Sequence, residues 1–201
     1  MNLRKIRLAL WGLVAVVAIG VGLFLMLAKP AQAPLGEVRS TTFQESIGGD
    51  WALVDATGNS FGSDNLQGRP HAVFFGFTHC PDICPNTLSR LARLRKDLGE
   101  DSFDIVFISV DPERDGPEEV GKYADLFGTP VIGLTGSETQ IQAVMEQFGV
   151  AREIVELDGG GYTVDHTANV FLFDRDGDFT VTISPEESRE PALEKLRRIV
   201  G

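Results

Sequence analysis

The hydrophobic pattern of the chain predicts a leading apolar helix followed by a sheet of strands and helices. Residues 8–28 carry no charge, and a helix needs about 20 apolar residues to cross a bilayer. Residues 71–77 and 103–110 are continuous apolar runs, which are typical of strands buried on both faces. Leucines recur at helical spacing between the two runs. These segments predict a βαβ unit, whose crossover should be right-handed.

Shorter elements flank this unit. A strand over residues 51–55 and a turn at 57–59 precede it. Pro117 suits a helix start and Ser137 suits an N-cap. The later elements are helices over 118–127, 137–148 and 190–200 and strands over 131–134, 151–156, 168–173 and 179–183. This order of strand, βαβ unit and ββα unit, with an inserted strand and helix, predicts an α/β protein with a thioredoxin-like fold.

The pattern divides the chain into three parts. Residues 1–29 form a cytoplasmic stub and transmembrane anchor, 30–46 a linker, and 47–201 the folded domain. Three basic residues precede the apolar segment and only Lys29 follows it, so the positive-inside rule places the domain outside the cytoplasm. We expect a single-pass protein of a bacterial inner membrane with its C-terminal domain in the periplasm.

A cleaved signal peptide is the competing interpretation of the N-terminal segment. Its apolar region usually spans about 7–15 residues, which is shorter than residues 8–28. The sequence Ala-Gln-Ala at 31–33 resembles a cleavage site, but Pro34 follows it directly and should hinder cleavage. The anchor is therefore favoured, and cleavage remains the alternative.

Charge and cysteine content exclude several classes of protein. The net charge is −11, from 18 basic and 29 acidic residues. Four of the basic residues lie in or beside the apolar segment, so 14 basic and 29 acidic residues, or −15, remain for the rest. Such a domain repels phosphate backbones, and we expect no nucleic-acid partner. Two cysteines in the whole chain exclude a scaffold built on disulfides.

The two cysteines lie where a strand gives way to a helix. Cys80 and Cys84 follow the strand at 71–77, and functional groups of open α/β sheets gather at the carboxyl ends of strands. A proline follows each cysteine and disfavours helical geometry there, so we expect one cysteine in a loop and the other in a first helical turn. A helix N-terminus lowers a thiol pKa. The spacing suits two ligands of one ion or a disulfide; two inert core thiols are the less fitting alternative.

Three motifs resemble those of the Sco/SenC family. Residues 76–85, Gly-Phe-Thr-His-Cys-Pro-Asp-Ile-Cys-Pro, resemble its copper motif. Residues 109–115, Ser-Val-Asp-Pro-Glu-Arg-Asp, and 164–167, Val-Asp-His-Thr, resemble its second and third motifs. The resemblance runs from about residue 47 to 200. It implies a thioredoxin-like fold, a membrane anchor and copper binding by Cys80, Cys84 and His166. It also implies a role in building the dinuclear copper centre, CuA, of cytochrome c oxidase subunit II.

The third predicted ligand occupies an informative position. A lone histidine is usually an ordinary surface or core residue, and it is the resemblance that makes His166 a ligand. Thioredoxin-class exchange enzymes carry a cis-proline just before the strand at 168–173, whereas this chain has no proline between Val131 and Ser184. An imidazole in place of that proline favours metal binding over disulfide exchange. Two thiolates and an imidazole suit one copper per monomer, as Cu(I) or Cu(II), whereas zinc would need a fourth ligand.

Further polar residues are candidates for supporting roles. Asp165 either orients His166 or caps the loop, and Asp111 either tunes the site or caps the turn that follows it. His79, beside Cys80, is a neighbour of the ligands at most. His71 begins its strand and is expected to be structural. The acidic residues Asp174, Asp176 and Asp178 lack the spacing of a calcium loop, so they predict a hairpin turn.

Two main functions are compatible with these residues. The first is a copper metallochaperone, not an enzyme, whose partners are cytochrome c oxidase subunit II and other periplasmic copper chaperones. The second is a thiol–disulfide reductase that keeps the CuA cysteines reduced, with Cys80 and Cys84 as its redox-active pair and thioredoxin-like reductases as partners. A peroxidase of the peroxiredoxin type is less favoured. Such enzymes need a Thr-x-x-Cys arrangement, in which the threonine lies three residues before the cysteine, whereas Thr78 lies only two residues before Cys80.

Overall fold

The computed structural model describes residue 11 and residues 47–201. Apart from residue 11, the predicted transmembrane anchor lies outside the described residues, as do the cleavage site and the linker. Within the part that the structure describes, no helix combines the length and the apolar character needed to span a membrane.

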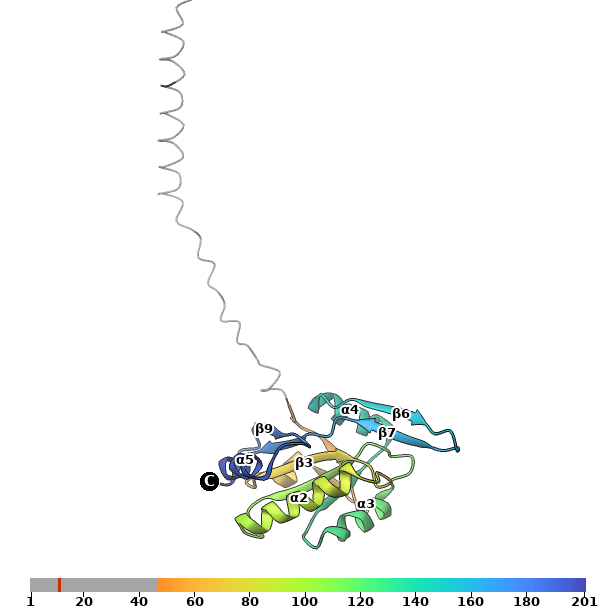
Figure 1. The fold of residues 1–201 in the computed structure, drawn as a ribbon, viewed down its shortest axis with the longest axis horizontal. Coiled ribbons are helices and arrows are strands. Elements are labelled where there is room, and N and C mark those ends of the chain that lie inside the picture. Colours follow the sequence, from red (N-terminus) through yellow and green to blue (C-terminus); the bar gives the residue numbers. More distant parts are fainter. Residues whose placement is uncertain (1–10, 12–46) are drawn as a thin grey trace, which may run out of the picture. The chain divides into compact units, whose positions relative to one another are not determined.

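Residues 47–201 form a seven-stranded mixed sheet and a separate two-stranded hairpin (Figure 1). The strands are β1 (Ala52–Asp55), β2 (Ser60–Gly62), β3 (His71–Gly76), β4 (Asp104–Ser109), β5 (Ile132–Thr135), β6 (Arg152–Glu156), β7 (Tyr162–His166), β8 (Val170–Phe173) and β9 (Phe179–Ile183). The α-helices are α2 (Ile83–Leu98), α3 (Pro117–Ala124), α4 (Glu138–Phe148) and α5 (Arg189–Val200), and the 3₁₀ helices are η2 (Ser63–Leu66) and η3 (Asp125–Phe127).

The sheet has the order β2-β1-β5-β4-β3-β8-β9. Strands β3, β4 and β5 run parallel, β8 pairs antiparallel with β3, and β9 pairs antiparallel with β8. All six residues of β3 are buried, as are the last five of β4. This burial explains why both strands are continuous apolar runs in the sequence, and the predicted βαβ unit is confirmed as β3-α2-β4.

Consecutive side chains of β3 serve opposite faces of the sheet, as strand geometry requires. Phe74 packs against Phe107, whose ring lies 5.1 Å from that of Tyr123 on α3. Phe75 packs instead against Phe148 of α4, with ring centroids 5.0 Å apart. Helices α2 and α3 therefore cover one face and α4 the other.

Helix α5 lies beside α2 on the first face. Arg90 of α2 donates hydrogen bonds to the carbonyls of Pro185 and Glu187, just before α5. Arg189 of α5 pairs with Asp97 of α2 at 2.7 Å. The C-terminal segment thereby fixes the outer side of the helix that carries Cys84.

Most of the predicted elements are confirmed, with two corrections. The helix expected over 118–127 is α3 followed by the 3₁₀ helix η3. The strand expected over 151–156 is β6, but it pairs only with β7 and lies outside the main sheet. The sequence did not predict β7, because the glycines at 159–161 read as part of a loop that ran on to His166. The insertion is thus helix α4 and a complete hairpin rather than one strand and one helix.

Candidate metal centre

The loop after β3 brings both cysteines to the same end of the sheet. The Cys80 amide donates to the Phe77 carbonyl at 3.2 Å, which folds the chain back before α2 begins at Ile83. Cys80 therefore lies in the loop and is partly exposed, whereas Cys84 lies in the first turn of α2 and is fully buried. The Cys84 amide points at Cys80 Sγ, 3.4 Å away.

Gly76, the last residue of β3, makes room for the buried sulfur. A Cβ atom built on Gly76 would lie 2.8 Å from Cys84 Sγ and 3.0 Å from the ring of Phe107. Real Cβ contacts are not that short. The Cys84 sulfur therefore occupies the volume in which any other residue at position 76 would place its side chain.

His166, the last residue of β7, turns its imidazole toward the cysteines. Its Nε2 atom lies 3.6 Å from Cys84 Sγ, and its Nδ1 atom lies 3.0 Å from the Thr167 carbonyl oxygen. A carbonyl oxygen only accepts, so Nδ1 carries the proton and donates. The lone pair of Nε2 then faces the sulfur, in the tautomer that a metal ligand requires. The rings of Phe74 and Phe77 stand edge-on to the imidazole.

The separation of these two atoms fits joint ligation of one metal ion. Zinc lies about 2.3 Å from sulfur and about 2.0 Å from nitrogen, and at a bond angle of about 110–120° such lengths separate the two donors by about 3.5–3.7 Å. The observed 3.6 Å between Cys84 Sγ and His166 Nε2 falls in this interval. Over the described residues, no three His, Cys, Asp or Glu side chains already form a metal-binding group. The three candidate ligands are thus neighbours rather than a finished coordination sphere.

The two sulfurs have opposite acidities. Hydrogen bonding with Cys84 is the main cause that lowers the pKa of Cys80 to about 4, and burial opposes it. The same hydrogen bond, together with burial, raises the pKa of Cys84 far above its ordinary value. Both cysteines are free. At neutral pH the pair is therefore a Cys80 thiolate beside a Cys84 thiol, whose proton a metal ion must displace.

A shallow pocket of about 280 Å³ opens over the centre. Cys80 and His166 line it, together with Phe77, Ile83 and Val164. The side of Ile83 that faces away from the core is exposed. A ligand donated by another molecule can therefore approach Cys80 and His166 from solvent, while Cys84 stays covered.

The structure places the three supporting candidates differently. Asp165 is exposed and makes no hydrogen bond to His166 within the described residues; the Thr167 carbonyl is the group that orients the ring. His79 is half-exposed, and its Nδ1 atom lies 3.0 Å from Thr78 Oγ1, turned toward Asp115 rather than toward the sulfurs. Asp111 is buried and bonds to Arg114 and to the Tyr162 hydroxyl.

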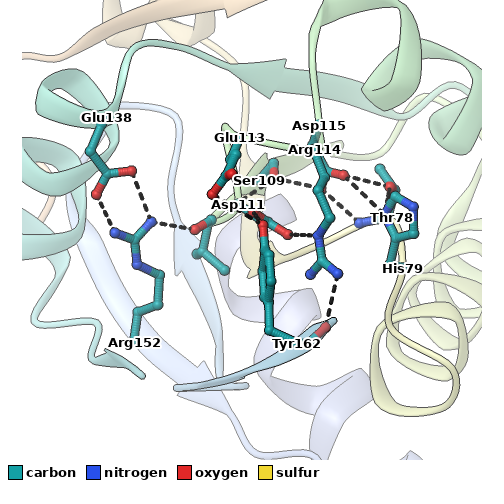
Figure 2. Close-up of polar contacts among 11 residues, drawn as sticks. Thr78, His79, Ser109, Asp111, Glu113, Arg114, Asp115, Glu138, Arg152 and Tyr162 are labelled. Carbon is teal, nitrogen blue, oxygen red and sulfur yellow. Dashed lines mark hydrogen bonds and ion pairs between the residues drawn. The ribbon is translucent and has the colours of Figure 1, made fainter. Parts of the chain in front are cut away.

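Asp115 is a supporting residue that sequence reasoning did not single out. Its buried carboxylate accepts hydrogen bonds from the Thr78 amide at 2.8 Å, the Thr78 hydroxyl at 2.6 Å and the Ser109 hydroxyl at 2.6 Å (Figure 2). It ties the cysteine loop to the end of β4. Its place in the second motif was the available signal.

Figure 2 also shows how the β6–β7 hairpin is attached to the loop after β4. Arg152 donates to the Val110 carbonyl at 2.6 Å and pairs with Glu138. Arg114 donates to the Tyr162 carbonyl at 2.9 Å. Neither arginine was predicted as a site residue. Arg114 lies in the second motif, as Asp115 does, whereas nothing in the sequence connects Arg152 with Cys80, Cys84 or His166.

A thioredoxin-like sheet with Cys-x-x-x-Cys after β3 and a histidine on an inserted hairpin defines a class of α/β proteins that bring two cysteines and one histidine to the same end of the sheet. The chain belongs to the SCO1/SenC family, whose model matches residues 39–201. It is 38% identical over 186 residues to the SCO2-like protein of Rickettsia conorii, covering 89% of this chain and 91% of that one.

Solved structures show the same relationship. The structure of Bradyrhizobium japonicum ScoI with copper bound is 37% identical, with a TM-score of 0.69, and covers 76% of this chain and 99% of that one. BsSco, a member of the Sco family of cytochrome c oxidase assembly proteins studied for a disulfide switch, is 23% identical with a TM-score of 0.60, over 78% and 94% of the two chains. The latter likeness concerns the fold alone. The predicted family and the thioredoxin-like α/β fold are confirmed.

Proposed function

We propose that this protein holds one copper ion between Cys80, Cys84 and His166 and delivers it to the CuA centre of cytochrome c oxidase subunit II. The observation that carries the proposal is the 3.6 Å approach of His166 Nε2 to the buried Cys84 sulfur. Residues 80 and 166 lie 86 positions apart, yet both line one pocket. The copper-bound relative from Bradyrhizobium japonicum supports copper as the metal.

The donor set has the chemistry of a carrier. Two soft thiolates and one imidazole suit Cu(I) and also accept Cu(II). The Cys80 thiolate, on the pocket wall, offers the first contact to an arriving ion, and Cys84 and His166 complete the set. Because Cys80 and His166 line the pocket, ligands of an acceptor protein can replace these two residues before the copper–sulfur bond to Cys84 breaks. Copper is then the cargo and no covalent turnover is required.

The proposed cellular setting follows from the N-terminal segment. Residues 8–28 would anchor the chain in a bacterial inner membrane and hold the domain in the periplasm, where subunit II exposes its CuA site. Other periplasmic copper chaperones would supply the ion. Detection of the chain in washed membranes, with the domain cleaved by protease added to the periplasmic side, would test this arrangement.

A thiol–disulfide reductase that keeps the CuA cysteines reduced is the second candidate. It is favoured by the pairing of a Cys80 thiolate, with a pKa of about 4, and a buried Cys84 thiol. Cys80 would attack a target disulfide and form a mixed disulfide. Cys84, on losing its proton, would then attack Cys80, which releases the target as a dithiol and leaves a Cys80–Cys84 disulfide.

Copper titration of the full chain tests the first candidate and separates it from the second. We expect one copper per wild-type chain, and loss of tight binding in His166→Ala and Cys84→Ser. His71→Phe, which removes a histidine at the opposite end of β3, should bind like the wild type. Wild-type affinity in His166→Ala would refute the copper site. The reductase would be favoured if the His166→Ala variant still reduces an oxidised CuA peptide while it transfers no copper to it.

A further inference from the structure

The hairpin that carries His166 lacks the support that the other strands have. Strands β6 and β7 pair only with each other and form no ladder with the seven-stranded sheet. Backbone hydrogen bonds to the sheet therefore cannot set the position of His166. Side-chain contacts must hold the hairpin in place, and two of the strongest come from arginines.

Arg152 supports the base of the hairpin. It is the cross-strand partner of His166 in the β6–β7 ladder. Its guanidinium donates to the Val110 carbonyl at 2.6 Å and pairs with the Glu138 carboxylate of α4. Since Glu138 is well exposed, that ion pair contributes little by itself. The bond to Val110, by contrast, fixes the strand position directly opposite His166.

Arg114 supports the other end of β7. Its Nε atom donates to the Asp111 carboxylate at 2.5 Å, and its Nη1 atom donates to the Tyr162 carbonyl at 2.9 Å. The guanidinium lies 3.7 Å from the centre of the Tyr162 ring, a stacked arrangement that favours arginine. The Tyr162 hydroxyl closes the group by donating to Asp111 at 2.9 Å. Tyr162 and His166 are the first and last residues of β7.

Arg114 also approaches the cysteine loop. Its guanidinium lies 5.8 Å from the ring centre of Phe77, within the distance of a cation–π contact. Phe77 in turn stands edge-on to His166, with ring centroids 5.9 Å apart. One guanidinium therefore connects the loop that carries Cys80 with the strand that carries His166. Figure 2 shows its polar contacts with Asp111 and Tyr162.

We propose that Arg114 and Arg152 are positioning residues of the metal centre, which together clamp the β6–β7 hairpin to Val110 and Asp111 and so keep His166 beside Cys84. The inference rests on the proposed copper site and extends it to two residues that touch neither sulfur nor imidazole. Lysine can keep the charge at each position, but it lacks the planar fork that makes both contacts at once. Arg114→Lys and Arg152→Lys should therefore loosen the clamp and leave the net charge unchanged.

The test measures copper binding and hairpin mobility on the full chain. We expect each variant to bind copper about 10–100-fold more weakly, as is usual for residues that orient a ligand. The nitrogen hyperfine signal and the thiolate-to-copper absorption of the Cu(II) form should also change. In the metal-free protein, amides of residues 162–166 should exchange hydrogen faster than in the wild type.

Arg95→Lys is the matched control for lost stability. Arg95 is buried and donates to the backbone carbonyls of Glu100 and Pro130, at the far end of α2. Its replacement should lower the melting temperature without changing the copper spectrum or exchange in β7. Tyr162→Phe removes the hydroxyl that bonds to Asp111 at 2.9 Å and to Glu113 at 3.5 Å but keeps the ring under Arg114. It should show the clamp phenotype more weakly, and it provides a second variant if the lysine variants misfold.

The outcomes separate this inference from the proposed function. If the wild type binds copper and both lysine variants match it in affinity, spectrum and exchange, the clamp is refuted and the copper site stands. The clamp would also be refuted if the loss of copper affinity in the two lysine variants is explained by a lower melting temperature alone, the effect for which Arg95→Lys is the control. If the wild type binds no copper, the proposed function fails. Exchange in β7 then decides the clamp alone, and unchanged exchange in both lysine variants would overturn it.

Discussion

At the residue scale, two cysteines four positions apart in the sequence differ in burial, and this difference decides their chemistry. Cys80 lies at the pocket and accepts a hydrogen bond from the Cys84 amide. Cys84 is fully buried, and hydrogen bonding between the two side chains lowers the pKa of Cys80 and raises that of Cys84. Burial disfavours charge, so the negative charge settles on the more exposed sulfur. The exposed thiolate is then the group that meets a metal ion or a disulfide first.

The alkylation rate of Cys80 should show this asymmetry. An ordinary thiol has a pKa of about 8.5, and below that value its reaction rate rises about tenfold for each unit by which the pH increases. Because the pKa of Cys80 is lowered to about 4, its reaction with iodoacetamide should be nearly constant from about pH 6 to 8. Cys84→Ala removes the main cause of the lowered pKa, so the pH dependence should return. Mass spectrometry of the modified peptide measures the rates, and a tenfold rise per unit in the wild type would contradict the assignment.

A methyl group at position 76 should displace the Cys84 sulfur of the candidate metal centre. In Gly76→Ala the new Cβ would overlap Cys84 Sγ and the rings of Phe74 and Phe107. Overpacking of this kind costs about 1–3 kcal/mol, which a urea unfolding curve can measure. Copper binding should weaken as well, because the sulfur must shift. Gly159→Ala, where a Cβ meets nothing within 4 Å, is the control, and equal stability of the two variants would count against the close packing.

Residue types predicted part of the centre and could not predict the rest. Cys80, Cys84 and His166 have side chains whose chemistry marks them in the sequence, and the motifs placed them in one site. Asp165 seemed the natural partner for His166, but the Thr167 carbonyl has that role. Every residue has a backbone carbonyl, so such a partner leaves no mark in the sequence. The second motif includes Arg114 but does not show its role, and no motif includes Arg152, since the contacts of both arginines depend on how the hairpin folds back.

At the scale of elements, the caps of the helices differ in strength. Ser137 accepts a hydrogen bond from the Gln140 amide, and Gln140 in turn accepts from the Ser137 amide, a complete capping box on α4. Ser188 occupies the same position on α5 but makes no side-chain cap. Ser137→Ala should therefore lower the free energy of unfolding by about 1 kcal/mol, and Ser188→Ala by clearly less. Thermal or urea unfolding compares the two, and equal losses would show that the cap of α4 is not needed.

Element patterns predicted the sheet better than its insertion. Strands β3 and β4 are buried on both faces, so their apolar runs identify them without reference to a partner. Strand β7 has no regular alternation of burial, since only Val164 is buried and only Asp165 is exposed among partly buried residues, and it follows three glycines. Gly160 and Gly161 adopt positive φ angles, 86° and 83°, in the turn of the hairpin, and a sequence pattern cannot tell such a turn from a long loop. The pairing of β6 with β7 rather than with the sheet depends on long-range packing.

At the scale of the whole molecule, the two ends of β3 have different roles, one in the candidate metal centre and the other in the core. Its carboxyl end leads to the cysteines, and its first residue, His71, belongs to the core. The His71 ring stacks on Phe173 with centroids 4.8 Å apart, and its Nδ1 atom donates to the Arg69 carbonyl at 3.0 Å. Substitutions at this end should therefore report on stability and leave the metal centre unchanged.

The pH dependence of global stability should carry the signature of His71. Burial lowers the pKa of His71 below its usual 6.5. Below about pH 6.5 the His71 side chain is protonated in the unfolded chain but stays neutral in the folded protein. The free energy of unfolding therefore falls as the pH is lowered from about 6.5 to the pKa of the folded state. One such group contributes at most about 1.4 kcal/mol per pH unit. In His71→Phe, which keeps the stacked ring, the fall between about pH 6.5 and 5 should be shallower. His79 and His166 are present in both proteins, so the difference between the two urea-unfolding series isolates His71, and parallel curves would show that its burial does not set the acid sensitivity of the fold.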